Sequence, residues 1–90
     1  MRQLFYSNQF KKDHKRIAKQ GKELEKLKDV IAKLVREEIL EDRLKDHPLR
    51  GNYAGTRECH LESDWLLIYR ITGNELHLLR TGSHAELLKM

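Results

Sequence analysis

The sequence predicts an α+β fold: a small single domain over residues 1–90, with element order β-α-α-β-β-β and a two-helix hairpin packed on one face of an antiparallel-rich sheet. Three observations predict it. The chain has 90 residues and a mass of 10.7 kDa, which suffices for one domain but not for two. Helical periodicity is confined to residues 8–40. Strand-like runs occupy residues 56–81, after the only proline.

The first half of the chain predicts one short strand and two helices. Residues 4–6 form a β-prone run. A helix is expected over residues 8–20, with Gly21 as its C-cap. The positions that share its apolar face are Phe10, His14 and Ile17. The second helix is expected over residues 22–40, which contain no helix breaker. Two helices separated by one glycine predict an antiparallel hairpin.

The second half predicts a loop followed by a three-stranded antiparallel unit. Residues 41–55 hold the only proline among clustered turn residues, so a loop is expected there. The three expected strands are 56–62, 65–72 and 75–81. Gly73-Asn74 separates the last two by two residues, which is typical of a hairpin. Residues 65–69 are apolar on both faces and predict a central strand.

Charge and cysteine content limit the class of protein. The net charge is +4 and the sequence pI about 9.3. Residues 1–45 carry +5 and residues 46–90 carry −1, so the basic charge lies in the helical half. The single Cys59 excludes an internal disulfide and suits a reducing compartment. No apolar run approaches the ~18 residues of a membrane helix, so we expect a soluble cytoplasmic protein without a membrane partner.

Ionisable side chains gather at the predicted strand ends and loops. His47 precedes the proline, which holds it extended. His60 and Asp64 flank the turn between two strands, where the carboxylate is close enough to orient the imidazole. Arg80 and His84 lie at the end of the last strand and just beyond it. Since histidine transfers protons near neutral pH, the predicted catalytic group is His47, His60, Asp64 and His84.

Each of these histidines also has an alternative interpretation without a catalytic role. Chance surface placement is the alternative for His47, His60 and His84. The sequence SHAE at 83–86 also matches a capping box, so His84 can simply begin a terminal helical turn. His14 is expected to be a packed residue on the helical stripe, and His77 a surface residue of a strand.

Metal chemistry is not expected. Cys59 and His60 are neighbours on a strand, so their side chains point to opposite faces. The sequence holds no C-x-x-C or H-x-x-x-H pair. We therefore expect no metal site and no cofactor, and Cys59 is expected to be a small core residue.

Lysines recur along the first predicted helix at three- or four-residue spacing: Lys11, Lys15, Lys19 and Lys22. A solvated helix face is the simpler interpretation. Because like charges at i and i+4 repel each other, the nearly uniform sign also indicates a polyanion such as RNA or DNA.

Four motifs together resemble one known family. They are YSxxFxxD at 6–13, KDHPLxG at 45–51, RECHLESDWLLIY at 57–69 and RTGSH at 80–84. This set, which covers nearly the whole chain, resembles the YafQ branch of the RelE/ParE toxin superfamily. The resemblance implies a RelE-like fold and the toxin of a type II toxin–antitoxin pair, an endoribonuclease that cuts mRNA in the ribosomal A site and inhibits translation.

The resemblance also implies functional residues and partners. It assigns functional positions to His47, His60, Asp64, Trp65 and His84, with Trp65 in substrate binding and Arg80 as a phosphate contact. The implied partners are a cognate antitoxin, mRNA and ribosomal RNA, the last through the lysines of the first helix, and the toxin alone is expected to be a monomer. RNA carries its own nucleophile, the 2′-hydroxyl, so a base, an acid and cationic support suffice without metal.

Two other functions remain open from the sequence. One is a ParE-like toxin that binds DNA gyrase without cleaving RNA, for which the histidines have no purpose. The other is a ribonuclease that acts without the ribosome.

Overall fold

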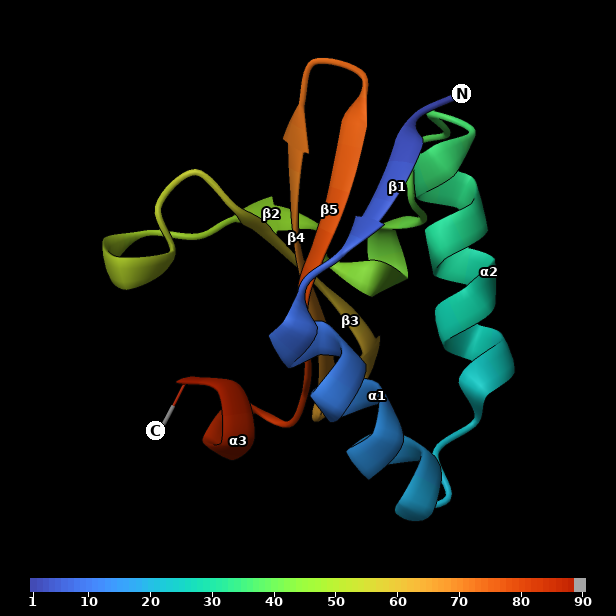
Figure 1. Ribbon diagram of the computed structural model, residues 1–90, viewed down its shortest axis with the longest axis vertical. Helices are drawn as coiled ribbons and strands as arrows, with labels where there is room; N and C mark the ends of the chain where they lie inside the picture. Colours follow the sequence, from blue (N-terminus) through green and yellow to red (C-terminus); the bar gives the residue numbers. More distant parts are fainter. Residues whose placement is uncertain (89–90) are drawn as a thin grey trace.

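A mixed sheet of five strands in the order β1-β5-β4-β3-β2 forms the middle of the molecule (Figure 1). The computed structural model describes residues 1–88. β1 (Gln3–Tyr6) runs parallel to β5 (Glu75–Gly82), and the other three pairings are antiparallel. The predicted α+β fold with an antiparallel-rich sheet is confirmed.

α1 (Asn8–Lys19) follows β1 after a single residue, Ser7, which caps it. The Ser7 hydroxyl accepts a hydrogen bond from the Phe10 amide at 2.9 Å and donates one to the Leu79 carbonyl at 2.9 Å. The cap therefore also ties the start of the helix to β5. Phe10 and Ile17 are buried as predicted, and so is Asp13, which lies between them.

α2 (Leu24–Val35) is shorter than the predicted helix over residues 22–40. It ends because Glu37 adopts a left-handed conformation, with φ of 63°, and the Glu37 and Glu38 amides turn back onto carbonyls of the last turn. The change of direction returns Leu40 to the core.

The predicted loop over residues 41–55 is wrong in one respect, because it contains a strand. Between the short 3₁₀ helices η1 (Asp42–Leu44) and η2 (Gly51–Tyr53) lies β2 (His47–Pro48), which pairs antiparallel with β3 (Arg57–Glu62). A proline fits there because an edge strand has a neighbour on one side only. His47 is extended, as the proline after it predicts.

The remaining elements agree closely with the sequence. β3, β4 (Trp65–Thr72) and β5 begin and end within one residue of the predicted strands, and Gly73-Asn74 forms the hairpin between the last two. α3 (His84–Leu88) begins at the predicted capping box. There the Ser83 amide donates to Glu86 Oε1 at 2.9 Å, and the Glu86 amide donates to Ser83 Oγ at 3.1 Å.

The two faces of the sheet are covered unequally. α1 and α2 pack on one face over the main core, whose largest side chains include Trp65, Leu67 and Tyr69. The predicted placement of both helices on one face is confirmed. On the other face Leu87 of α3 packs with Leu66 and Ile68 of β4 in a smaller cluster, which the segment around η2 also covers (Figure 1). This lightly covered face carries the candidate site. None of the described helices has the length and apolar character that a membrane span needs.

Candidate active site

Asp64 and His84 form a carboxylate–histidine pair at one end of the sheet. Asp64 lies in the turn between β3 and β4, and His84 is the first residue of α3. Asp64 Oδ1 accepts a hydrogen bond from the His84 amide at 3.0 Å and lies 2.8 Å from His84 Nδ1. The hydrogen bond from the His84 amide, followed by that from its side chain, lowers the pKa of Asp64 below its ordinary value. Asp64 therefore stays ionised, and a proton on His84 Nδ1 leaves Nε2 as the free ring nitrogen.

A second carboxylate, Glu58, lies between two histidines. Its side chain is buried, with 6 % exposure, and Glu58 Oε2 lies 3.0 Å from His47 Nε2 and 3.3 Å from His60 Nε2. His47 Nδ1 lies 2.6 Å from the Lys45 carbonyl, which fixes the ring from its other side. Glu58 Oε1 has no hydrogen-bond partner among residues 1–88. A buried, half-satisfied carboxylate costs stability, and such costs concentrate at functional sites.

Strand register brings these groups together. β2 pairs His47 with Glu58, and alternation along β3 puts Glu58 and His60 on the same face. The His60 ring lies 5.9 Å from that of His47 and 5.7 Å from that of His84, measured between centroids. The three histidines thus form a continuous row across the open sheet face, with Glu58 between His47 and His60 and Asp64 at His84.

The structure changes one predicted pairing and adds one residue. The sequence pairs His60 with Asp64, but Asp64 bonds His84, and His60 lies beside Glu58 instead. The prediction was wrong because it used sequence distance across the turn, whereas the turn directs Asp64 toward the end of β5. Glu58 was missed, although its i, i+2 spacing to His60 on a strand was a usable signal.

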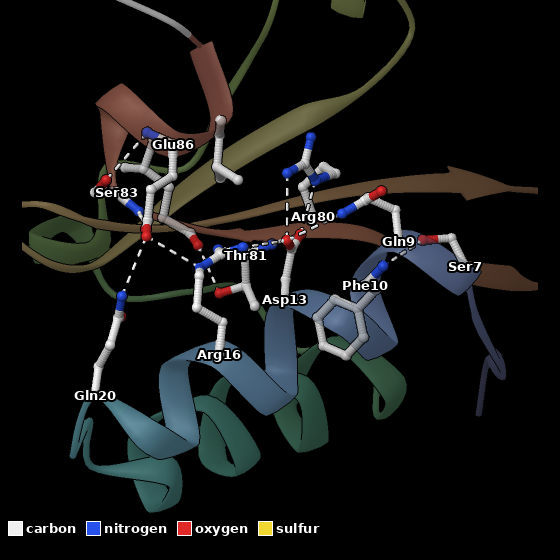
Figure 2. A network of polar contacts seen from close by, with 12 residues as sticks. Ser7, Gln9, Phe10, Asp13, Arg16, Gln20, Arg80, Thr81, Ser83 and Glu86 are labelled. Carbon is white, nitrogen blue, oxygen red and sulfur yellow. Dashed lines mark hydrogen bonds and ion pairs between the residues drawn. The ribbon is translucent and has the colours of Figure 1, made fainter.

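Asp13 holds Arg80, whose register partner on β4, Ile68, is also the register partner of Glu58. Arg80 Nε donates to Asp13 Oδ2 at 2.7 Å, and its Nη2 donates to Oδ1 at 3.2 Å (Figure 2). Asp13 is 0 % exposed and also accepts from Arg16 and from the Thr81 amide. Burial raises the pKa of Asp13, but the bonds from Arg80, Arg16 and Thr81 outweigh burial, so the pKa lies below its ordinary value. Asp13 thus presents Arg80 as an oriented, partly exposed cation.

Trp65 does not have the predicted place at the substrate. Its side chain is 0 % exposed in the main core, where the indole Nε1 donates to Thr81 Oγ1 at 2.9 Å. The motif marks Trp65, but its burial is that of a packing residue. Thr81 in turn donates to the Leu66 carbonyl, so the indole fixes β5 against β4.

The lysines divide into two groups. Lys11, Lys15 and Lys19 are exposed along α1 and form the basic face. Lys22 lies after α1, where its Nζ stands 5.8 Å from the centre of the Trp65 ring, so it lies at the site end of the molecule. His14 is partly buried beside Phe10, as expected. His77 was predicted to be a surface residue of a strand, and its partly exposed ring stacks on Phe5.

One group of side chains has the composition of a metal site. His47, Glu58 and His60 offer ligand atoms that all lie within 4.8 Å of one another. Two imidazoles and a carboxylate suit transition metals such as Zn²⁺ or Cu²⁺. Cys59 takes no part: it is buried in the core, as predicted, and burial raises the pKa of its thiol to about 12.

Known proteins resemble this chain over nearly its whole length. Residues 2–89 match the family model described as the bacterial toxin of a type II toxin–antitoxin system, YafQ. The mRNA interferase toxin YafQ of Escherichia coli K12 is 42 % identical over 87 residues, which cover 96 % of this chain and 95 % of that protein.

Solved structures agree with this match. The crystal structure of YafQ from E. coli BL21(DE3) has a TM-score of 0.92 and 41 % identity, covering 97 % of this chain and 98 % of that one. The crystal structure of an E. coli DinJ–YafQ complex has a TM-score of 0.90 and 42 % identity, covering 97 % of this chain and 98 % of that one. The crystal structure of a metal-bound toxin from Helicobacter pylori has a TM-score of 0.90 and 44 % identity, covering 97 % of this chain and 99 % of that one.

Proposed function

This chain belongs to the YafQ family of bacterial type II toxins, and from that premise we propose that its two carboxylate–histidine units supply the acid and the base of a ribosome-dependent RNA cleavage. The protein is an mRNA interferase, an endoribonuclease. The observation that carries the proposal is the 5.7 Å between the His60 and His84 rings, which places one histidine of each unit within reach of a single phosphate group.

The reaction uses the 2′-hydroxyl of the substrate as nucleophile. A base removes the 2′-hydroxyl proton, the oxygen attacks the adjacent phosphorus, and the bond from phosphorus to the 5′-oxygen breaks while an acid protonates that oxygen. The products are a 2′,3′-cyclic phosphate and a 5′-hydroxyl. Arg80, which Asp13 orients, stabilises the charge on the phosphorane oxygens. These steps are metal-independent.

We assign the acid to His84 and the base to His60. The ionised Asp64 holds Nδ1 of His84 and leaves Nε2 to deliver a proton. His60 shares the buried carboxylate of Glu58 with His47, which orients its ring and balances the charge it gains from the 2′-hydroxyl.

A substrate with sulfur in place of the bridging 5′-oxygen tests this assignment. Sulfur leaves as a thiolate without protonation, so loss of the acid no longer matters. On ordinary RNA both His84→Ala and His60→Ala are expected to lose about 10²–10⁴-fold in rate. On the sulfur substrate only His84→Ala recovers. If the sulfur substrate instead restores the rate of His60→Ala, His60 is the acid and His84 the base.

Dependence on the ribosome follows from the open site. The row lies on a lightly covered sheet face and not in a deep cleft, so the chain alone has few groups to fix a flexible RNA. The exposed Lys11, Lys15 and Lys19 supply a surface for ribosomal RNA, which in turn presents the mRNA. Cleavage of the same transcript is compared on translating ribosomes and free in solution, beside a gyrase supercoiling assay. Equal cleavage of free RNA contradicts ribosome dependence, and gyrase inhibition without cleavage contradicts the whole proposal.

An antitoxin is the protein partner. YafQ of E. coli is seen in complex with DinJ, and 42 % identity extends that partnership to a DinJ-like protein here. We propose that the free toxin is a monomer, because the like charges of α1 oppose association through that face, and that it acts in the cytoplasm, where mRNA is translated. Co-purification with the product of the neighbouring gene, followed by light scattering of the separated toxin, tests both statements.

A further inference from the structure

Arg16 of α1 joins three parts of the chain around the end of β5 (Figure 2). Its Nη1 donates to the buried Asp13 at 2.8 Å, and its Nη2 donates to the Thr81 carbonyl at 2.9 Å. Its Nε lies 3.0 Å from Glu86 Oε2, in an ion pair. Thr81 precedes the turn that carries His84, and Glu86 follows it. The guanidinium therefore holds that turn from both sides.

Close packing leaves this arrangement little freedom. A Cβ at Gly82 would lie 2.5 Å from Arg16 Nη2 and 2.9 Å from Glu86 Oε1, so any larger residue there would displace the ends of these two side chains. On its far side, Arg16 is fixed by Asp13, which is itself bonded to Arg80. The donors of a planar guanidinium point in fixed directions. The contact with Asp13 therefore also determines where the Thr81 carbonyl and the Glu86 carboxylate can accept from Arg16.

Glu86 passes this constraint to His84. Glu86 Oε1 accepts from the Ser83 amide, and Ser83 Oγ accepts from the Glu86 amide, which together set the first turn of α3. Gln20, the C-cap residue of α1, donates a further hydrogen bond to Glu86 Oε2 at 3.2 Å. His84 begins that turn, and its amide and Nδ1 both meet Asp64.

We propose that Arg16 and Glu86 are positioning residues that hold His84 against Asp64. Neither residue touches the substrate. The relevance of this to catalysis rests on the proposed role of His84 as the acid. It also separates Arg16 from the lysines beside it in the sequence, since the guanidinium faces the protein and not a polyanion.

Arg16→Gln and Glu86→Gln test the proposal kinetically. Lys12→Gln, on the exposed side of the same helix, is the matched control. Each test variant is expected to lower kcat by about 10-fold or more while KM stays within about threefold of the wild-type value, because the lost contacts act on the reacting geometry and not on binding. With the sulfur-bridged substrate the loss should largely disappear, as for His84→Ala. If Arg16 and Glu86 have a merely structural role, their substitution lowers the cleavage rates of ordinary RNA and of the sulfur-bridged substrate by the same factor.

The His84 amide gives a readout that does not depend on catalysis. Its hydrogen exchange, measured by NMR, should become faster in both test variants and stay unchanged in Lys12→Gln, with the Leu78 amide inside β5 as internal reference. Wild-type exchange at His84 in the test variants overturns the proposal. Faster exchange with unchanged kcat supports the positioning and contradicts the acid role of His84 instead. If Arg16→Gln does not fold, Glu86→Gln, whose side chain is partly exposed, carries the test alone.

Discussion

Asp64 Oδ1 accepts the amide of His84 at 3.0 Å and lies 2.8 Å from its Nδ1, although 20 residues separate the two in the chain. One oxygen thereby fixes both the start of α3 and the orientation of the imidazole. The backbone contact positions His84, and the side-chain contact stabilises the positive charge of its imidazolium form.

Asp64→Asn is expected to separate these two contributions. The amide oxygen can still accept from the His84 backbone, but a neutral side chain no longer stabilises an imidazolium or enforces the Nδ1–H form. We expect kcat to fall by about 10²–10⁴-fold with little change in KM. Single-turnover cleavage on ribosomes measures this, and wild-type thermal unfolding confirms that the fold is retained. A variant with the wild-type rate refutes a role for the Asp64 charge.

Glu58→Gln tests the carboxylate between His47 and His60. Glutamine has the same size, yet it cannot balance a positive imidazole, so toxicity should be relieved and the cleavage rate should fall by roughly 10²-fold. The matched control is Glu62→Gln, further along β3, whose carboxylate pairs with Lys26 at a half-exposed site. Equal rates for the two variants contradict the assignment of Glu58 to the base unit.

Metal ions are expected to inhibit and not to activate. Zn²⁺ or Cu²⁺ bound by His47, Glu58 and His60 occupies the nitrogen lone pairs that proton transfer needs. Cleavage should therefore continue after the toxin itself is dialysed against EDTA, and micromolar Zn²⁺ restored to the toxin should slow it. Calorimetric titration of Zn²⁺ into wild-type and His47→Ala proteins tests the ligand set. Activity that requires added metal would falsify the metal-independent mechanism.

The basic face of α1 is tested by Lys11→Gln, Lys15→Gln and Lys19→Gln combined, with Lys22→Gln made separately because Lys22 lies near Trp65. If the three exposed lysines contact ribosomal RNA, binding weakens, and its log–log dependence on salt becomes shallower by about 0.7–0.9 for each lost contact. Ribosome pelleting across a salt series measures this in a His60→Ala background, so that no transcript is cut. Unchanged binding and slope identify the lysines as a solvated helix face.

Stability should depend on pH through Asp13. Its pKa is lower in the folded protein than in the unfolded chain, so its contribution is present above the unfolded value of ~3.9 and is lost as pH falls through the lower folded value. Asp13→Asn removes the carboxylate that pairs with Arg80 and leaves Arg16 paired with Glu86 alone. The expected loss at neutral pH is roughly 2–4 kcal/mol, below that for a fully buried pair because both guanidinium groups are partly exposed.

Urea unfolding of the wild type and of Asp13→Asn at several pH values between about 2 and 7 checks this. The difference in stability between the two proteins should shrink toward acid pH. A difference that stays constant across this range contradicts the role of the Asp13 charge.

Local signals made two parts of the fold predictable. Alternation and a two-residue hairpin turn predict the strands β3, β4 and β5. The capping box is predictable because the Ser83 side chain accepts from the amide of Glu86, only three residues further along the chain. The end of α2 was not predictable in the same way. It depends on the left-handed conformation of Glu37, which glutamate rarely adopts, so no local sequence signal marks the end of the helix.

The sequence by itself determined which histidines to consider, because a proline, a turn and a strand end place His47, His60 and His84 outside the two long predicted helices. Only the tertiary structure decided their partners. Register between β2 and β3 sets Glu58 beside His47, and the turn after β3 sends Asp64 to His84 in place of His60. Likewise, Asp13 reads as a polar residue on a helix and Trp65 as a motif residue, until packing buries both. The physical reason is the same in each case: a side chain's partner across strands and helices follows from long-range register and burial, which local sequence does not encode.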